Sequence, residues 1–142
     1  MEAMDAQILR AYWPHVVVTK IVAAGEDLVM HSYVVDPAAG RATQWHSVSQ
    51  FRGAEDSAKR RLISRANRLL HWRDIEHFKA QGLRIFDLGG YAYNTEDEGL
   101  KRINEFKDSF GGALVEESSY SSVAINLLRR VKSALKGEAK RR

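Results

Sequence analysis

The residue of this sequence best suited to chemistry is a lysine beside the apolar stripe of an expected helix. The segment GLKRINEFKDSFGG (99–112) places Phe106 on that stripe and Lys107 next to it. An ammonium group in this position can stabilise negative charge that develops on a carbonyl oxygen, or hold an anionic group of a substrate. A surface lysine whose aliphatic stem lies along apolar neighbours explains the same pattern. These residues alone leave both interpretations open.

A glycine pair follows a short apolar run earlier in the chain. The run LRIFDL (83–88) predicts a short buried strand, and Gly89 and Gly90 end it. Adjacent glycines let the backbone turn with positive φ and approach a ligand or another strand closely. Tyr91 comes next, and its phenol can donate a proton to a leaving group. A tight turn and ordinary aromatic packing explain these residues equally well.

No other motif indicates a known kind of active site. The chain has no cysteine, which excludes disulfide bonds and thiolate nucleophiles. A metal is not expected, because no i,i+4 pair occurs among the histidines, which are His15, His31, His46, His71 and His77. The glycine patterns of dinucleotide and phosphate loops are missing. In SQFRGAEDSAKRR (49–61) a helix N-terminus suits a phosphate, but Glu55 and Asp56 already complement the helix dipole.

Length and composition predict one globular domain, residues 1–142, located in the cytoplasm. Hydrophobic residues make up 44% of the chain and charged residues 28%, an ordinary balance for a folded domain. No run of about 18 apolar residues occurs, and the first residues lack the pattern of a signal peptide. The absence of cysteine fits a reducing compartment. We therefore expect no membrane as a partner.

The net charge of +4 is concentrated at the C-terminus. Residues 129–142 carry seven basic side chains and one acidic, whereas the preceding 128 residues carry fifteen basic and seventeen acidic. The segment 122–142 is predicted to be a basic amphipathic helix with a short tail. Such a helix is most often a solvated face, but it also suits RNA or an acidic partner. The rest of the chain is not basic.

The first half of the chain predicts a helix followed by an antiparallel meander. Residues 3–12 suit a short helix, and the runs 15–23, 28–35 and 41–51 are rich in β-branched residues and are separated by turns. A long helix is expected over 56–81, capped by Asp56 or Ser57 and ended by Gly82. Its apolar face is predicted from the helical spacing of Leu62, Ala66, Leu69 and Trp72.

The second half predicts a strand, a helix and a last strand. After the strand at 83–88, Thr95 and Glu98 suggest a capping box at the start of a helix that Gly111 and Gly112 end. A last strand is expected at 113–117. A helix between two strands of one sheet implies a parallel crossover. The fold class is therefore α+β, a mixed sheet of antiparallel meander and parallel crossover flanked by helices.

Two stretches resemble the Fem-type branch of the GNAT acyltransferase superfamily. The stretch RANRLLHWRDIEHFKAQGLRIFDLGGY resembles the helix–strand segment of that family, which ends in Asp-(apolar)-Gly-Gly. The stretch from Phe106 to Gly111 is similar to the family signature of phenylalanine–lysine, two residues and phenylalanine–glycine. The resemblance covers about residues 15 to 120. It corresponds to the later part of one domain, with the N-terminal strand and helices truncated.

The resemblance implies a GNAT-like fold in which 83–88 splays from 41–51 and opens a cleft for an acyl donor. It implies catalytic roles for Lys107, which would polarise the carbonyl, and for Tyr91. It also implies a set of donor- and substrate-binding residues, which are Ser47, Ser49, Phe51, Arg52, Gly53, Asp87, Gly89, Gly90 and Phe106. An acceptor amine would attack the acyl carbon directly, so that catalysis is mainly positioning and oxyanion stabilisation.

The resemblance leaves the donor open. Members of the family include peptidoglycan-bridge aminoacyltransferases that use aminoacyl-tRNA, and related proteins described as N-acetyltransferases. Acetyl-CoA or another acyl-CoA would then be a co-substrate, or tRNA a partner, with an amine acceptor and no metal. A second copy or a partner domain would complete the sheet, since an uncovered sheet edge invites pairing. The alternative function is a non-catalytic GNAT-fold remnant that binds or oligomerises, and contacts RNA through its basic tail.

Overall fold

The computed structural model describes residues 13–118, beginning with the 3-10 helix η1 (Trp13–His15). The chain divides into two compact units, Met1–Lys101 and Arg102–Arg142, which are described separately. The helix predicted at 3–12 and the basic helix and tail predicted at 122–142 lie outside the described residues. A single domain over the whole chain stays a prediction.

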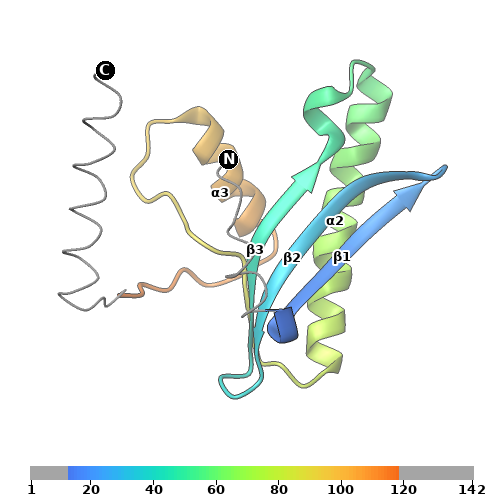
Figure 1. Ribbon diagram of the computed structural model, residues 1–142. Coiled ribbons are helices and arrows are strands. Elements are labelled where there is room, and N and C mark those ends of the chain that lie inside the picture. The colour runs from blue at the N-terminus through green and yellow to red at the C-terminus, as the bar shows by residue number, and fades with distance from the viewer. Residues whose placement is uncertain (1–12, 119–142) are drawn as a thin grey trace, which may run out of the picture. The chain divides into compact units, whose positions relative to one another are not determined.

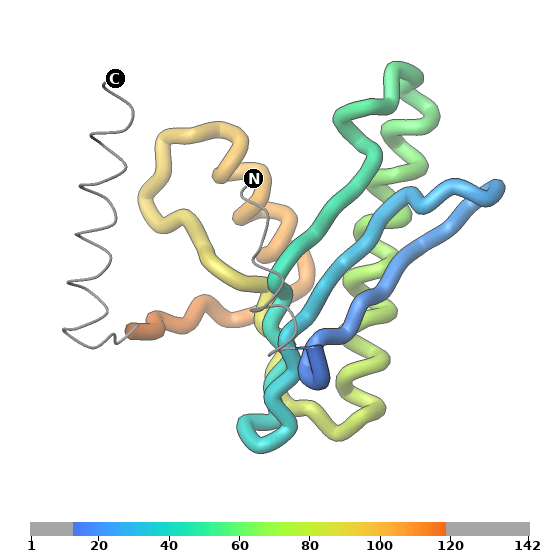
Figure 2. Tube along the Cα trace, viewed as in Figure 1, coloured from blue at the N-terminus to red at the C-terminus, as the bar shows by residue number. Residues whose placement is uncertain are grey.

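Within the described residues, four strands form one mixed sheet in the order β1-β2-β3-β4 (Figure 1). They are β1 (Val16–Ala23), β2 (Glu26–Asp36), β3 (Arg41–Ser49) and β4 (Ile85–Asp87). The first three pair antiparallel, and β4 pairs parallel with β3 after the chain has crossed over through a helix (Figure 2). The predicted α+β class, with meander and parallel crossover, is confirmed. This arrangement is consistent with a GNAT-like fold.

The hairpin between β1 and β2 turns on two residues with positive φ. Ala24 has φ 51° and Gly25 has φ 81°, the backbone that a two-residue hairpin turn requires. In the turn between β2 and β3, the carboxylate of Asp36 accepts a hydrogen bond from the amide of Ala39 at 3.0 Å. Gly40 ends this turn with φ 63°. Both turns fix the register of the meander, which brings matched residues of β1, β2 and β3 side by side.

The long helix α2 (Ser57–Ala80) begins and ends where the sequence predicts. The carboxylate of Asp56 accepts hydrogen bonds from the amides of Ala58 at 3.1 Å and Lys59 at 2.9 Å, which caps the helix. Gly82 follows the last turn with φ 82°, the left-handed conformation common after a helix C-terminus. Helix α2 lies along one face of the sheet (Figure 1).

The predicted apolar face of α2 is wrong for three of its four residues, and only Ala66 is buried. Leu62, Leu69 and Trp72 are 50%, 51% and 52% exposed, so they lie on the solvent side. The side that packs on the sheet is shifted by one position and consists of Ile63, Ala66, Leu70, His71, Asp74 and Phe78. Periodicity alone could not choose between these two stripes, because α2 carries apolar residues on both.

Two hydrophobic clusters join α2 to the sheet. One contains Leu28 and Val29 of β2, which pack with Ile63, Ala66 and Leu70. The other is formed by Tyr33, Ala42 and Phe78, with the rings of Tyr33 and Phe78 4.9 Å apart. A buried polar group lies on the same face of the sheet between these elements, and it is described below.

The strand β4 is shorter and less buried than the predicted strand at 83–88. Only Ile85, Phe86 and Asp87 pair with β3, and Ile85 is exposed. Phe86 and Leu83 pack against the cluster that contains Phe78. A strand at the end of the sheet has one neighbour only, so half of its surface stays accessible.

The cap of helix α3 (Glu98–Asp108) differs from the predicted capping box. The carboxylate of Asp97 accepts hydrogen bonds from the amides of Gly99 at 2.7 Å and Leu100 at 3.0 Å. The Thr95 hydroxyl instead accepts from the amide of Asp97 at 3.2 Å. A carboxylate placed next to the first turn therefore caps the helix in place of the hydroxyl two residues earlier. The predicted stop is confirmed, since Gly111 follows the helix with φ 73°.

The predicted strand at 113–117 is wrong. These residues have no regular secondary structure, and Leu114 and Val115 are exposed. Strand propensity depends on a partner strand and on burial. A run of three apolar residues followed by Glu116 and Glu117 supplies neither by itself.

Candidate functional site

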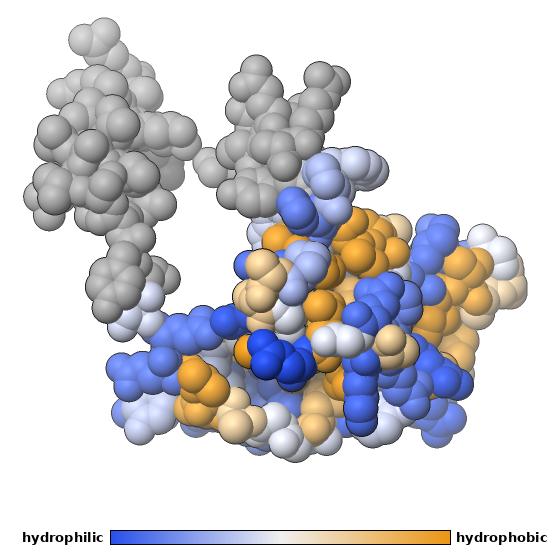
Figure 3. All heavy atoms as spheres, turned by 90° about the horizontal axis from the view of Figure 1, so that it is seen from below, coloured by the Kyte–Doolittle hydropathy of each residue, from blue (hydrophilic) through white to orange (hydrophobic). Residues whose placement is uncertain are grey.

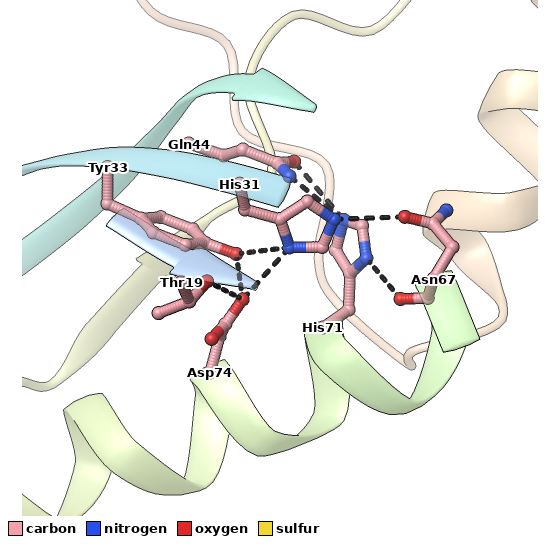
Figure 4. A network of polar contacts seen from close by, with 7 residues as sticks. All are labelled: Thr19, His31, Tyr33, Gln44, Asn67, His71 and Asp74. Carbon is pink, nitrogen blue, oxygen red and sulfur yellow. Dashed lines mark hydrogen bonds and ion pairs between the residues drawn. The ribbon is translucent and has the colours of Figure 1, made fainter. Parts of the chain in front are cut away.

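A buried polar cluster joins β1, β2 and β3 to α2 (Figure 4). Its members, here called the polar core, are Thr19, His31, Tyr33, Gln44, Asn67, His71 and Asp74. His31 and Tyr33 are fully buried, and His71 and Asp74 are each 2% exposed. Burying polar groups is unfavourable unless each finds hydrogen-bond partners. The partners in the polar core therefore decide whether α2 can pack on the sheet.

Asp74 is the centre of the polar core. Its Oδ2 atom lies 2.6 Å from the hydroxyl of Tyr33, 3.0 Å from that of Thr19 and 2.9 Å from Nδ1 of His31. Both hydroxyls donate to this oxygen. Hydrogen bonds to a carboxylate are stronger than those between neutral groups. One carboxylate oxygen of α2 thus holds side chains from both β1 and β2.

His31 bridges Asp74 and Asn67. Its Nδ1 faces the carboxylate, and its Nε2 lies 2.9 Å from Oδ1 of Asn67. Each ring nitrogen of His31 thus has a side-chain partner from α2, a carboxylate oxygen at one and an amide oxygen at the other. The side chains of α2 thereby supply both partners of a buried histidine on β2.

His71 has the opposite arrangement. Its Nδ1 donates to the backbone oxygen of Asn67 at 2.9 Å, which leaves Nε2 as an acceptor 3.0 Å from the Gln44 amide nitrogen. The rings of His71 and His31 lie 4.0 Å apart. Burial lowers the pKa of His71 to about 4, and the neighbouring His31 acts in the same direction, although the bond to Asn67 opposes it. The polar core therefore holds His71 neutral.

The phenol of Tyr33 is also held neutral. Burial and the hydrogen bond to the Asp74 carboxylate both raise its pKa above the ordinary value. Because Tyr33, His31, His71 and Asp74 are all buried, they are closed to substrate in this conformation. The chemical effect of the polar core is to keep these ionisable side chains away from solvent, inside the fold. It joins sheet to helix.

Sequence reasoning missed the polar core, although two signals for it exist. Val29, His31 and Tyr33 are every second residue of β2, so their side chains point to the same face of the sheet. Asn67, His71 and Asp74 are spaced i, i+4 and i+7, which places them on one side of α2. The two polar residues of β2 and the three of α2 face each other once the helix packs on the sheet.

At the predicted cleft, the ladder between β3 and β4 is short. It contains the pairs Arg41↔Ile85, Ala42↔Phe86 and Thr43↔Asp87, whereas β3 continues to Ser49. Gly89 follows with φ 76°, and a Cβ at this position would lie 3.5 Å from the backbone oxygen of Gln44.

The carboxylate of Asp87 fixes the end of β4. Its Oδ2 accepts from Arg41 at 2.7 Å, and its Oδ1 accepts from the amide of Gly89 at 2.7 Å. Burial alone would raise the pKa of Asp87, but the hydrogen bonds from Arg41 and Gly89 outweigh burial and lower it. This carboxylate is therefore ionised and joined to β3, which positions the glycine pair that follows it.

The predicted donor-binding residues from Ser47 to Gly53 lie at the other end of β3. Ser47 and Ser49 are exposed on β3, and the 3-10 helix η2 (Gln50–Gly53) follows directly. The ring of Phe51 in η2 has its centre 5.9 Å from the guanidinium of Arg60, which belongs to α2. Arg52 and Gly53 are exposed. At about 3.3 Å per residue, Ser49 lies roughly 20 Å along β3 from Thr43.

The predicted catalytic residues lie in different parts of the chain. Tyr91 is half-buried in the loop after the glycine pair. Phe106 and Lys107 belong to the second unit, where the rings of Phe106 and Phe110 pack edge to face with centres 5.2 Å apart. Lys107 is half-buried. The structure thus brings Asp87 and Gly89 beside β3, and the roles of Tyr91 and Lys107 stay predictions.

Two further properties of residues 13–118 limit the kinds of site they form. No group of three or more histidine, aspartate and glutamate side chains is arranged there to hold a metal ion. No helix in this part of the chain is both long enough and apolar enough to cross a bilayer. A comparison with protein-family models, curated proteins and solved structures finds no match to the chain.

Proposed function

We propose that the chain is an N-acyltransferase domain whose acyl donor binds along β3 beyond Thr43. The observation that carries this proposal is the length of the β3–β4 ladder, which ends at Thr43↔Asp87 while β3 continues to Ser49. A strand that has left its neighbour offers an edge along which an extended ligand can lie. The positive φ of Gly89 supports the proposal, because it ends the extended backbone that β4 needs in order to continue along β3.

The donor would be an acyl-CoA such as acetyl-CoA, or an aminoacyl-tRNA. Both donors end in an activated carbonyl and carry phosphate groups at a distance from it. The edge from Gly89 to Arg52 would hold such an elongated molecule, with Ser47 and Ser49 along it and Arg52 near the phosphates. Gly53 adds no side chain to obstruct that end. Both donors are made in the cytoplasm, so we propose this location.

The reaction would be direct transfer. The nitrogen of an acceptor amine attacks the acyl carbon, and the carbonyl oxygen gains negative charge that the ammonium of Lys107 would stabilise. The bond to sulfur of the acyl-CoA, or to oxygen of the tRNA ester, then breaks. Tyr91 would give its proton to that leaving group, and the nitrogen would lose one to solvent. The products are an amide and the free thiol or hydroxyl.

The test is product formation by the purified chain. Acetyl-CoA and charged tRNA are each incubated with a panel of amines, and the amide is measured by mass spectrometry. Lys107→Ala should lower kcat/KM by about 100-fold, because one oxyanion donor contributes about that much. Lys101→Ala is the matched control on the same helix, where Lys101 pairs with Glu98 at 2.9 Å. Equal turnover of both variants would remove Lys107 from the reaction, and no product from either donor would contradict the function.

A second candidate function is a non-catalytic module that binds another copy of the chain. The face of the sheet opposite α2 favours it, because Val18, Val22, Met30 and Val48 are exposed there. Figure 3 shows hydrophobic side chains at the surface among hydrophilic ones on the face seen from below. Light scattering after size-exclusion chromatography should then give a dimer that Val18→Glu dissociates. A stable monomer with turnover would contradict this function.

A further inference from the structure

The outer face of α2 combines exposed apolar residues with arginines. Leu62, Leu69 and Trp72 are each about half exposed, although residues of this size are usually buried when they lie on a helix that packs on a sheet. They are spaced i, i+7 and i+10, which is the a and d pattern of a helix that packs against another helix. At 1.5 Å per residue the row is about 15 Å long.

The charge around this row is positive. Arg61, Arg65 and Arg68 are exposed and are spaced i, i+4 and i+7, so they lie beside the row on the solvent side. Helix α2 carries seven basic side chains and two acidic ones, and one of the acids, Asp74, is buried in the polar core. The other acid, Glu76, pairs with Arg73 at 3.0 Å.

Within residues 13–118 the positive charge belongs to α2 and not to the other elements. Outside α2, the described residues 13–118 carry seven basic and thirteen acidic side chains. A broad anionic surface such as a bilayer would meet those acids as well as the arginines. A narrow ligand that lies along α2 meets the arginines alone.

We propose that this face of α2 binds an acidic amphipathic helix of a partner protein. Helix α2 satisfies its own backbone hydrogen bonds, so it cannot pair with a strand, and recognition must use side chains. Two of the three apolar side chains in the row are leucines, which contact the apolar stripe of a helix but have no partner on a phosphate backbone. Glutamates or aspartates beside that stripe would pair with Arg61, Arg65 and Arg68. Trp72 and the arginines are the residue types that dominate binding energy at interfaces.

The experiment measures binding of the full chain to dye-labelled probes by fluorescence anisotropy. The first probe is a designed 18-residue helical peptide with leucines at a and d positions and glutamates beside them. A second peptide has lysines in place of the glutamates, and a third has the same residues in scrambled order. A single-stranded RNA and vesicles containing phosphatidylserine are the remaining probes. The acidic amphipathic peptide should bind at least ten times more tightly than either other peptide.

Variants of the face separate its two contributions. Leu69→Ala and Arg65→Glu should each weaken binding of the acidic peptide about tenfold or more, and only the effect of Arg65→Glu should shrink at high salt. Leu114→Ala and Arg84→Glu are matched controls, exposed but far from the row along the chain, and should bind as the unchanged protein does. Circular dichroism confirms that each variant is folded. Equal binding of the acidic and basic peptides, unchanged binding by Arg65→Glu, or a preference for RNA or vesicles would overturn the proposal.

Discussion

Lowering the pH from 7 to 4.5 should destabilise this protein through His71. In the unfolded chain a histidine has a pKa near 6.5, whereas burial lowers the pKa of His71 to about 4 in the fold. Between these values the unfolded chain binds a proton that the folded chain excludes. The stabilising contribution is therefore complete above about pH 6.5 and is lost as the pH falls towards 4.

The magnitude follows from the size of the pKa shift. A difference of about 2.5 pH units at about 1.4 kcal/mol per unit gives about 3 to 4 kcal/mol across the window. Near pH 5 the free energy of unfolding should change by at most about 1.4 kcal/mol per pH unit, the value for one proton. The groups that face His71 are His31, Asn67, Gln44 and Asp74, and the hydrogen bond from the Gln44 amide to Nε2 also depends on the neutral ring.

The assay is urea unfolding followed by circular dichroism at half-unit intervals from pH 4.5 to 7.5. His71→Gln removes the titrating group, so it should lower the stability at pH 7 and flatten the slope between pH 4.5 and 6.5. His77→Gln is the matched control, since His77 is exposed on the same helix. A flat profile for the unchanged protein, or the same slope after His71→Gln, would refute the reasoning.

Four further substitutions test the fold by urea unfolding. Asp74→Ala should cost about 3 to 5 kcal/mol, because it leaves buried donors of Tyr33 and its neighbours unpaired. Tyr33→Phe should cost about 1 to 2 kcal/mol, and a double-mutant cycle with Asp74→Ala should show strong coupling. Phe78→Ala should cost about 3 to 5 kcal/mol through the cavity it leaves. Asp56→Ala should destabilise less than Phe78→Ala, and its effect should shrink in acid, because accepting the amides of Lys59 and Ala58 lowers the pKa of Asp56. An additive cycle, or a cap effect that persists in acid, would contradict these two interpretations.

The order of the elements could be predicted because local chemistry marks their ends. The carboxylate of Asp56 accepts hydrogen bonds from amides of the first turn of α2, and Gly82 has a positive φ after the last turn. The sequence therefore predicts both ends of α2. The meander follows from β-branched runs separated by turn residues. Its two turns need no information from distant parts of the chain.

The facing of α2 could not be predicted in the same way. Leu62 and Ile63 are neighbours of equal hydrophobicity, and only packing on β2 decides that Ile63 is buried. The buried side of α2 also contains His71 and Asp74. Burying these polar residues would be unfavourable without His31 and Tyr33, which lie opposite them on β2. Each of β2 and α2 carries its own polar pattern, but no local signal shows that groups 41 to 43 residues apart lie opposite each other.

The predicted cleft illustrates an intermediate case. The glycine pair correctly marks the end of β4, since the positive φ of Gly89 favours a residue without a side chain. The sequence could not predict where the pairing of β3 and β4 ends. That point depends on a contact between distant residues, the hydrogen bond from Arg41 on β3 to Asp87 on β4. The strand predicted at 113–117 is absent for a similar reason. Strand pairing depends on a second segment, which the residues of this run do not specify.

The convergence of Tyr33, Thr19 and His31 on one oxygen of Asp74 has a consequence for how this part of the molecule moves. If α2 separated from the sheet by itself, Tyr33, Thr19 and His31 would all lose their shared hydrogen-bond acceptor at once. Partial opening is therefore costly, and the helix and the first hairpin should exchange their amide hydrogens with solvent as a single cooperative unit.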